Sequence, residues 1–442
     1  MTKLLAAAAL AALLTVPLAP AAPAAAPPAC TRMTGPPPAS PPPTSVGTLG
    51  QAFFCVLDHY YGGPGLRSQE LLRDAFAAYT RNLHKRGADV AGLRLPALTG
   101  DRDADWAAAA RALGTGDPVA LRAAVEGMVA GLRDNHARLH VPEPPREGGP
   151  VGTGIVGASG ISGPGVDPAA RPPFFITDVV EDSPADRAGV RPGDIVQAID
   201  GVPVWVGETL NPLLVEQVQQ PSFTITLKRP TTGRVRTVKL TEGPLTPPDR
   251  APVVRDVSGV RYVKLPAFSD GAADQVIAAL RGGPEKVVVD LRGNGGGSPK
   301  EVARLLGAFA HGEITGYFCT YDGSCTPNRT DDTVPLLGAR LVVLTDRRCA
   351  SACEAFSSAV QELGIGPIVG TRTAGAISGP AAAWLLGDGS VLAMPSVRHL
   401  GPEKEIIDLV GVPADHHAPM TALDLATGRD PALRKALSLL NG

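Results

Sequence analysis

The sequence predicts a multidomain α/β protein in three parts: an N-terminal helical region (46–148), a β-rich unit (150–245) and an α/β layered region (255–442). Its 442 residues exceed the usual size of a single domain. Apolar residues recur at helical spacing in the first part, and short apolar strands bounded by turns fill the second. Strands alternate with helical segments in the third part, which is typical of helices packed on a sheet.

The composition excludes several classes of protein. Hydrophobic residues make up 44% of the chain, enough to fill real cores. With 41 basic and 43 acidic residues the net charge is −2, so no basic excess exists to bind nucleic acid or an anionic membrane. Aromatic residues, at 4%, are too scarce for base-stacking surfaces. We therefore expect no nucleic-acid partner.

The N-terminus predicts a signal peptide over residues 1–26. Lys3 precedes the apolar run from Leu4 to Val16, whose 13 residues are too few to span a bilayer. Ala22-Pro23-Ala24 then offers the small-x-small pattern that a signal peptidase reads. We expect a secreted or extracytoplasmic protein with no stable membrane span after processing, and an uncleaved anchor is the alternative.

A proline-rich stretch follows the signal peptide. Between Pro17 and Pro43 there are 11 prolines in 27 residues, a density that neither helix nor sheet tolerates. The sequence therefore predicts a disordered leader over 27–45.

Helix signals are clear in the first part. Ser68 is a candidate N-cap for a helix whose apolar residues recur through Leu83. Asp117-Pro118 is a second cap, followed by the proline that favours a first helical turn. A helix over 119–132 then ends in the turn Asp134-Asn135-His136.

Six cysteines in an exported chain favour disulfides: Cys30, Cys55, Cys319, Cys325, Cys349 and Cys353. Cys319 and Cys325 flank a turn and predict a local bridge, and a Cys30–Cys55 bridge would tie down the leader. For Cys349 and Cys353, which straddle Ser351, the sequence leaves a bridge and two buried thiols equally open. A zinc site is not expected, because no CxxC pair or nearby histidine doublet accompanies these cysteines.

The β-rich unit contains the string SPADRAGVRPGDIVQAIDGVPV, which begins at Ser183. This string resembles the second half of a PDZ domain of the bacterial periplasmic-protease type. The resemblance implies capture of an extended chain by strand addition. The backbone amides near Gly154, Ile155 and Val156 would then receive its terminal carboxylate. A small β-barrel without a peptide role is the alternative.

The third part predicts strands and helices in alternation. The last helix opens at the cap Asp430-Pro431. The expected strands and helices before it are Val260 to Leu265, Ala272 to Arg281, Val287 to Asp290, Lys300 to Ala310, Leu341 to Thr345 and Ser351 to Leu363.

Two features of this part can carry chemistry. Ser351 follows a strand and a short loop and opens a helix, where amides and the helix dipole favour developing negative charge. The run DLRGNGGG, from Asp290 to Gly297, ends in three glycines that let a backbone approach a ligand closely. Taken singly, the serine is also a common N-cap and the glycines also fit a flexible turn.

Together the two motifs carry a second resemblance. DLRGNGGG followed by CASACEAF is similar to the C-terminal processing (tail-specific) serine peptidases, which often have a PDZ unit upstream. The resemblance implies an α/β (ClpP/crotonase-like) peptidase core and no cofactor or metal. It implies Ser351 as the catalytic nucleophile, with the amides of Ala352 and Gly296 forming an oxyanion hole.

One departure from this family concerns the base. The processing branch places a lysine about 25 residues after the serine, whereas this chain has Thr373-Ala374-Gly375-Ala376 there. That stretch is similar to the tricorn-like branch, whose base is a histidine of the N-terminal region. LRDNHARL, which contains His136, resembles the corresponding element, so His136 is the expected general base. His399, His416 and His417 remain alternatives.

A third group should orient the imidazole. DLVGVPAD, from Asp408 to Asp415, resembles the tricorn-like pattern Glu-x-x-Gly-Val-x-Pro-Asp. Asp replaces Glu and the proline is displaced by one residue. Asp408 is the expected orienting residue, with Glu405 and Asp415 in reserve.

The sequence therefore predicts an exported serine endopeptidase that hydrolyses peptide bonds in protein or peptide substrates and captures them with a PDZ domain. The alternative is a catalytically silent peptide-binding protein on the same scaffold.

Overall fold

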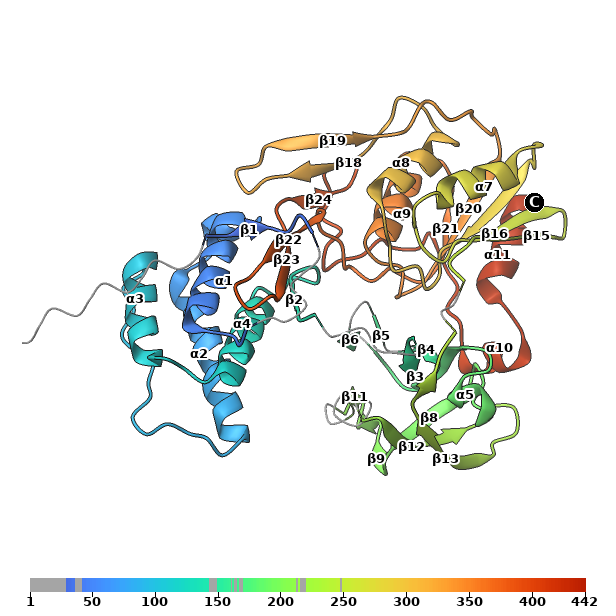
Figure 1. Ribbon diagram of the computed structural model, residues 1–442. Helices are drawn as coiled ribbons and strands as arrows, with labels where there is room; N and C mark the ends of the chain where they lie inside the picture. Colours follow the sequence, from blue (N-terminus) through green and yellow to red (C-terminus); the bar gives the residue numbers. More distant parts are fainter. Residues whose placement is uncertain are drawn as a thin grey trace, which may run out of the picture.

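The structure is a computed structural model that describes residues 29–35, 42–142, 149–159, 161–162, 165–166, 170–211, 214, 220–246 and 249–442. A helical region, a β-rich unit and an α/β region make up the fold, as predicted (Figure 1). The predicted signal peptide lies outside these residues. Within these ranges no helix is both long and apolar enough to cross a membrane.

Four helices build the first part: α1 (Val46–His59), α2 (Ser68–Lys85), α3 (Arg102–Leu113) and α4 (Pro118–Gly131), with the short turn η1 (Gly63–Gly65). Asp117 caps α4 as predicted, because its carboxylate accepts the N–H groups of Val119 and Ala120. The predicted cap at Ser68 is wrong by one residue. Arg67 is the N-cap of α2, and the Ser68 hydroxyl instead donates to the buried Asp105 carboxylate.

A four-stranded sheet joins the two ends of the sequence. Its order is β1-β22-β23-β2, with β1 (Thr31–Arg32), β22 (Ala381–Leu385), β23 (Val391–Pro395) and β2 (Arg138–His140). Leu392 and Met394 of β23 are fully buried among the helices of the first part. The sequence predicted 255–442 as one continuous α/β region. The structure differs, because β22 and β23 return to the helical region and lie beside α1 and α4 (Figure 1).

The described residues of the predicted disordered leader are partly ordered, so that prediction is wrong for 29–35. Thr31 and Arg32 pair antiparallel with Leu385 and Trp384, and Cys30 is bonded to Cys55. No proline occurs between 29 and 35, so the main chain is free to pair with the edge of β22.

The α/β region contains a six-stranded sheet of order β15-β16-β17-β20-β21-β25. Only the β15–β16 pair is antiparallel. The strands are β15 (Val253–Val257), β16 (Val260–Lys264), β17 (Lys286–Asp290), β20 (Arg340–Thr345), β21 (Ile368–Gly370) and β25 (His416–His417).

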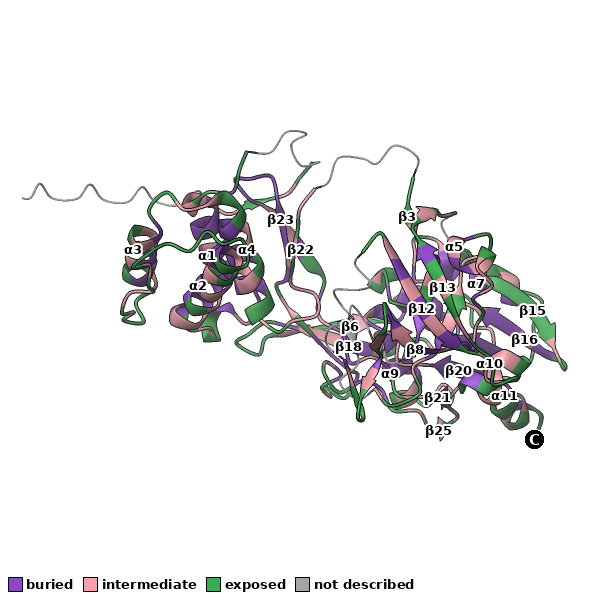
Figure 2. Ribbon diagram, turned by 90° about the horizontal axis from the view of Figure 1, so that it is seen from below, coloured by how far each residue is buried: buried purple, intermediate pink, exposed green. Residues whose placement is uncertain are grey.

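Helices cover both faces of this sheet, as Figure 2 shows by the buried strands between them. Alternate residues of β17 divide between the two sides: Val287 and Val289 face one cluster, and Val288 the other. The helices α7 (Ala272–Leu280), α8 (Pro299–Gly307) and α9 (Ala352–Glu362) pack in the first cluster, and α11 (Pro431–Asn441) in the second. All four were predicted, with ends displaced by up to three residues.

A second, three-stranded sheet lies beside this core. It consists of β18 (Ile314–Cys319), β19 (Cys325–Arg329) and β24 (Arg398–Leu400), in the order β19-β18-β24. The predicted Cys319–Cys325 bridge closes its hairpin, and Cys349 and Cys353 form a bridge as well.

The β-rich unit has its own apolar core, centred on Val196, Ile225 and Leu227. Asp194 is buried there and forms ion pairs with Arg229 and Arg236. The helix α10 (Ala422–Thr427) of the α/β region packs against Gly193. The main sheet is β13-β12-β8-β9, made of β8 (Ile195–Ile199), β9 (Val202–Pro203), β12 (Ser222–Lys228) and β13 (Val235–Thr241).

Short elements complete the unit. The pairs are β3 (Val151–Gly152) with β14 (Gly243–Pro244), β4 (Ile155–Ala158) with β7 (Ile176–Val179), β5 (Ile161–Ser162) with β6 (Gly165–Val166), and β10 (Trp205–Val206) with β11 (Thr209–Leu210); the helix is α5 (Pro184–Arg187).

Leu392→Ala should destabilise the helical region although the residue lies in the C-terminal part of the sequence. Truncating a buried leucine costs about 2–5 kcal/mol. We expect faster amide hydrogen exchange in α1 and α4 and little change in β17 and β20. Leu305→Ala, which truncates a buried residue of α8, should instead speed exchange in β17 and β20 and change it little in α1 and α4. Equal exchange changes in both regions would contradict the packing described here.

Candidate active site

Ser351 lies at the junction between β20 and α9, where the chain turns sharply. Its backbone has φ 56° and ψ −122°, in a region that residues with a side chain rarely adopt. Ser351 is the N-cap of α9 and forms a capping box with Glu354, whose carboxylate accepts the Ser351 N–H. The Ser351 hydroxyl lies at the positive end of the helix dipole.

Glu354, three residues on, holds this turn in place. It is fully buried, and its carboxylate accepts the N–H of Ser351 at 3.2 Å. It also accepts the Thr373 hydroxyl at 2.6 Å and the N–H groups of Gly375 and Ala376 at 2.6 and 2.8 Å. Burial raises the pKa of Glu354 to about 7, while these donors favour the ionised form.

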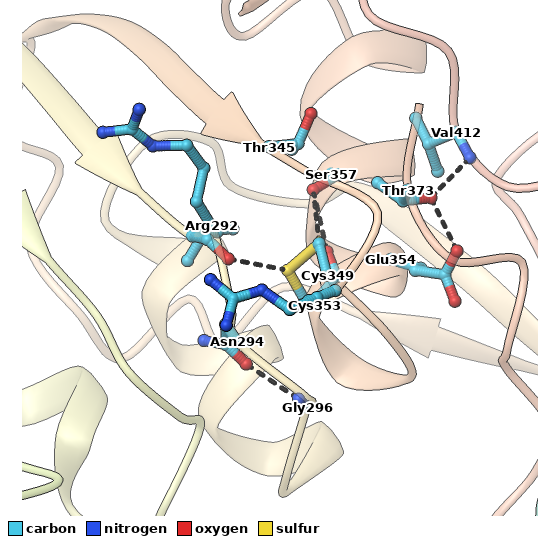
Figure 3. The surroundings of a disulfide bond; sticks show 12 residues. Arg292, Asn294, Gly296, Thr345, Cys349, Cys353, Glu354, Ser357, Thr373 and Val412 are labelled. Carbon is cyan, nitrogen blue, oxygen red and sulfur yellow. Dashed lines mark hydrogen bonds between the residues drawn. A yellow bond between two sulfur atoms is a disulfide. The ribbon is translucent and has the colours of Figure 1, made fainter. Parts of the chain in front are cut away.

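The stretch 373–376 forms a structural connection between the start of α9 and a later segment of the chain. The Thr373 hydroxyl donates to Glu354 and accepts the Val412 N–H at 2.7 Å (Figure 3). The C=O of Gly375 accepts the Leu409 N–H at 2.8 Å. Through these bonds the start of α9 is joined to the segment that contains Asp408.

Sequence reasoning missed Glu354. Its signal was present: Ser351-x-x-Glu354 before an apolar run matches the serine and glutamate spacing of a helix capping box.

The glycine loop lies on the other side of Ser351. The Ala350 N–H donates to the C=O of Asn294 at 3.0 Å, and the Asn294 amide donates to the C=O of Leu265 at 2.9 Å. The Gly296 N–H donates to the Asn294 side-chain oxygen at 2.8 Å, so in this conformation it does not point to a substrate. Gly297 lines the cavity described below, and in the described part of the chain its N–H has no partner.

Buried charges anchor the strand that leads into this loop. Asp290, at the end of β17, is paired with Lys264 and Arg292 and accepts the Tyr262 hydroxyl. Lys264 and Arg292 hold the pKa of Asp290 well below its usual range despite its burial. Arg292 also reaches Asp430, the N-cap of α11. The acid of the DLRGNGGG motif therefore has a structural role.

A cavity of about 250 Å³ brings Ser351 and His136 together. It is lined by residues of α8, α9, the β18–β19–β24 sheet and the segment 377–381. Asp, Glu, Lys and Arg are absent from its lining in the described part of the chain. The side chains around the space are His136, Pro299, Val302, Thr315, Phe318, Asn328, Ser351, Ala352, Ala355, Ile377, Ser378, Pro380, Ala381 and His399.

His136 reaches this cavity from the turn before β2. Asp134 shapes the turn by accepting the backbone N–H groups of His136 and Ala137 at 2.7 and 3.2 Å. The Tyr60 hydroxyl of the helical region donates to the second oxygen of Asp134 at 2.9 Å. Burial lowers the pKa of His136, and the Asp134 charge opposes that change. Nδ1 of His136 is buried without a hydrogen-bond partner among the described residues.

Asp408 lies near this histidine turn, whereas its two reserve residues do not. Burial and the charge of Asp134 raise the pKa of Asp408 to about 6, although its bond to the Ile377 N–H lowers it. Glu405 instead accepts the Ser358 hydroxyl, and Asp415 accepts the Ile368 N–H and the Gln361 amide. No hydrogen bond joins Ser351, His136 and Asp408 in the conformation of the described chain.

The alternative histidines differ in position. His399 lines the same cavity, where burial lowers its pKa to about 4. His416 and His417 form β25 at the edge of the six-stranded sheet and do not line the cavity.

A second cavity, of about 380 Å³, lies in the β-rich unit. It is lined by β4 and by apolar side chains such as Phe174, Val196 and Ile225. Ile155 and Val156 belong to this lining, and Gly154 precedes them with φ +87°. In the described residues β4 is paired along one edge only, by β7. An extended peptide could therefore add along its other edge.

Comparison with known proteins gives two family matches. Residues 259–418 match the family described as peptidase family S41, and residues 175–229 match the PDZ domain. The first range contains Ser351, Gly296 and Asp408. It leaves out His136, which precedes it in the sequence.

Relatives and solved structures agree. The chain is 30% identical over 341 residues to a carboxyl-terminal-processing protease of Picosynechococcus sp., covering 72% of this chain and 78% of that protein. It is 28% identical over 286 residues to tricorn protease homolog 1 of Streptomyces coelicolor, covering 62% of this chain but 25% of that longer protein. A photosystem II D1 C-terminal processing protease has the same fold, with a TM-score of 0.54 at 19% identity over 90% of this chain and 97% of that one.

Gly296→Ala should displace Ser351. A Cβ at position 296 would lie 2.7 Å from the Ser351 Cβ and 2.9 Å from the Ala352 nitrogen, at φ +106°. Because misplacing a reacting group by about 1 Å costs about 10²-fold, we expect that loss in the rate of Ser351 labelling by a fluorophosphonate probe. Gly295→Ala is the matched control, since a Cβ there meets nothing within 4 Å. Equal labelling of the two variants would show that the contact at Gly296 does not matter.

Proposed function

The chain belongs to peptidase family S41 and is a serine peptidase, and from that premise we propose that it is an exported endopeptidase of the tricorn-like Ser/His type. In this proposal Ser351 is the nucleophile, His136 the general base and Asp408 the group that orients the base. Substrates are proteins or peptides, and the PDZ domain captures them.

One observation carries the proposal: Ser351 and His136 line the same cavity, although they come from distant parts of the sequence. The strained backbone of Ser351 supports a nucleophile, because residues in sparsely populated backbone conformations cluster at active sites. The strand β2, paired with β23, fixes the chain directly after His136.

In the proposed reaction, Ser351 Oγ attacks the carbonyl carbon of the scissile peptide and His136 accepts the hydroxyl proton. The C–N bond breaks as His136 returns that proton to the leaving amine. Water then attacks the acyl-enzyme with the same base and releases Ser351. Burial lowers the pKa of His136, so the imidazole is neutral and able to accept a proton at neutral pH.

The negative oxygen formed by the attack needs two N–H donors. Ala352 supplies the first in this proposal, since it opens α9 and its N–H has no partner within the helix. For the second donor we prefer Gly297 to the predicted Gly296, whose N–H is bonded to Asn294. Gly296 instead provides the space in which Ser351 turns.

The orienting role of Asp408 fits the buried, unpartnered Nδ1 of His136. A carboxylate that accepts the Nδ1 proton would fix the tautomer in which Nε2 faces Ser351. Hydrogen bonds between catalytic groups are often long in the absence of substrate and shorten when it binds. In this proposal Asp134 and Tyr60 hold the backbone of the turn that contains His136, and Asp408 orients the imidazole.

Substrate capture and export are supported by separate features. The apolar cavity beside β4 fits the side chains of an extended, uncharged C-terminal segment, with the amides near Gly154, Ile155 and Val156 proposed to receive its carboxylate. Three disulfides use all six cysteines, which suits an oxidising compartment outside the cytoplasm. The predicted signal peptide points the same way.

The alternative from the sequence, a catalytically silent peptide-binding protein, is tested by comparing cleavage with binding. We expect Ser351→Ala to abolish cleavage of an unstructured peptide. His136→Ala should lower turnover by about 10²–10⁴-fold, the usual contribution of a general base. Both variants should bind the peptide as the wild type does, because the PDZ cavity is untouched.

His417→Ala is the control, since this histidine lies outside the cavity. Full activity of His136→Ala together with loss of activity in His399→Ala would overturn the assignment of the base. Binding without cleavage or fluorophosphonate labelling in the wild type would establish the silent alternative.

The pH dependence tests Asp408. The proposed mechanism needs Asp408 ionised and His136 neutral, so kcat/KM should fall as either gains a proton. Because the pKa of Asp408 is raised to about 6 and that of His136 is lowered, we expect activity to rise with pH and reach half its plateau near pH 6.

Asp408→Asn should lower kcat/KM at least about tenfold, because the imidazole loses the carboxylate that orients it, and should remove the contribution of Asp408 ionisation near pH 6 from the profile. Asp415→Asn is the matched control, because that carboxylate bonds only to Ile368 and Gln361. An Asp408→Asn profile identical to that of the wild type would remove Asp408 from the mechanism.

A further inference from the structure

Cys349 and Cys353 lie two residues before and two residues after Ser351, and a disulfide joins them. We propose that this disulfide is a positioning element for the nucleophile: it holds the turn at Ser351 in the reactive conformation and in register with the glycine loop. The inference rests on the proposed function, because it takes Ser351 as the nucleophile.

The backbone at Ser351 is strained and has to be held in place. Ser351 adopts φ 56°, a conformation that a residue with a side chain leaves readily unless its neighbours prevent it. The C=O of Cys349 accepts the Ala374 N–H at 2.9 Å, which holds the chain before Ser351. After Ser351 the chain is held by Glu354. The disulfide closes a covalent ring that contains the five residues from Cys349 to Cys353.

The disulfide also contacts the start of the glycine loop. Figure 3 shows the disulfide between Cys349 and Cys353. Both cysteines are fully buried, and Sγ of Cys353 lies 3.7 Å from the carbonyl oxygen of Leu291. Leu291 is the residue that leads from β17 into the loop containing Asn294, Gly296 and Gly297. On the opposite side, Sγ of Cys349 lies 3.9 Å from the Ser357 hydroxyl of α9. The sulfur pair therefore packs between α9 and the start of the loop proposed to hold the oxyanion.

The effect of this disulfide on the position of Ser351 is distinct from the effect of a disulfide on the stability of the fold. A disulfide stabilises a fold through the loop that it closes in the unfolded chain, and the effect grows with loop length. Cys349–Cys353 spans 4 residues in sequence, against 6 for Cys319–Cys325 and 25 for Cys30–Cys55. Its effect on the unfolded chain is therefore the smallest of the three, and the benefit that we infer is local to Ser351.

The test uses paired variants of the full chain. Cys349→Ala/Cys353→Ala should lower kcat and the rate of fluorophosphonate labelling by about 10²-fold, the cost of misplacing a reacting group by about 1 Å. KM should change little, because no residue that lines the cavity has been altered. The melting temperature should fall less than in the control.

Cys30→Ala/Cys55→Ala is the matched control. It removes a disulfide that closes a longer loop in the helical region, so it should lower the melting temperature more while kcat is retained below that temperature. If kcat and labelling of the Cys349→Ala/Cys353→Ala variant equal those of the wild type, the inference is wrong. It is equally wrong if activity follows the folded fraction in both variants.

A second measurement covers the case in which Cys349→Ala/Cys353→Ala does not fold. The variant Cys30→Ala/Cys55→Ala/Cys319→Ala/Cys325→Ala keeps Cys349–Cys353 as its single disulfide. It is unfolded in urea and refolded with or without dithiothreitol, whose two thiols give two electrons and two protons to the bond and become a cyclic disulfide. The two samples have one sequence and differ in this bond, which is checked by counting free thiols.

We expect the reduced sample to lose kcat and labelling, and to regain both on reoxidation. Equal kcat in the two samples would overturn the inference. Failure of the proposed function looks different, because the wild type would then neither cleave peptide nor label at Ser351.

Discussion

The carboxylate of Glu354 lies fully buried at the start of α9 and accepts hydrogen bonds from Ser351, Thr373, Gly375 and Ala376. A buried carboxylate is tolerated only where donors surround it, and each donor would in turn be left unsatisfied without it. The turn at Ser351, the stretch 373–376 and, through Thr373, the segment at Val412 are therefore fixed together. The Ser351 N–H also donates to the C=O of Ala376 at 2.9 Å, so the position of Ser351 depends on the buried carboxylate and on the stretch that this carboxylate holds.

His136, the proposed base, comes from a different part of the chain, and a second constraint places it near Ser351. The strands β22 and β23 leave the α/β region and pair with β1 and β2, so that Leu392 and Met394 are buried among the helices. The turn before β2 carries His136, and Asp134 and Tyr60 hold its backbone. The cavity between Ser351 and His136 exists because residues 381–395 complete the core of the helical region.

The sequence predicted the features that depend on local signals. Three strands of the α/β sheet, the four helices around it and the cap at Asp117 follow from apolar periodicity and cap chemistry, and the structure has them. The fold class and the peptidase family were predicted from DLRGNGGG, CASACEAF and the PDZ string, and the comparisons confirm both. The roles of individual site residues remain predictions.

What sequence reasoning missed depends on contacts between residues far apart in the chain. No signal in the sequence near Thr31 shows that residues 384 and 385 provide a strand edge with which it can pair. The prediction of disorder for this segment therefore rested on the prolines that flank it. The N–H of Gly296 has a partner two residues away, but only the folded loop turns Asn294 toward it. The sequence could not decide whether Cys349 and Cys353 form a disulfide, because their spacing is compatible both with a bridge and with two buried thiols.

The loop that precedes Ser351 also faces the β-rich unit. Arg348 lies against Gly157 of β4, where a side chain would collide with its guanidinium, and its Nη2 would lie 3.2 Å from a Cβ at Gly293 of the glycine loop. A cavity of about 420 Å³ between the two parts is lined by Ala158 and Thr177 on one side and by Asp346 and Arg348 on the other. The strand proposed to receive the substrate thus contacts the residue that precedes Cys349.

This arrangement has a consequence for how capture and cleavage are related. Arg348 contacts β4, Ala350 is bonded to the glycine loop, and Cys349 is covalently joined to α9 through Cys353. Each of these contacts fixes one side of a segment only a few residues long, and Ser351 lies at its end. Such a segment has little freedom to move at one contact without moving at the others, because packed interiors deform poorly. A continuous series of contacts therefore runs from Gly157, which lines the PDZ cavity, to Ser351, the proposed nucleophile, and the disulfide is its only covalent cross-link in the described chain.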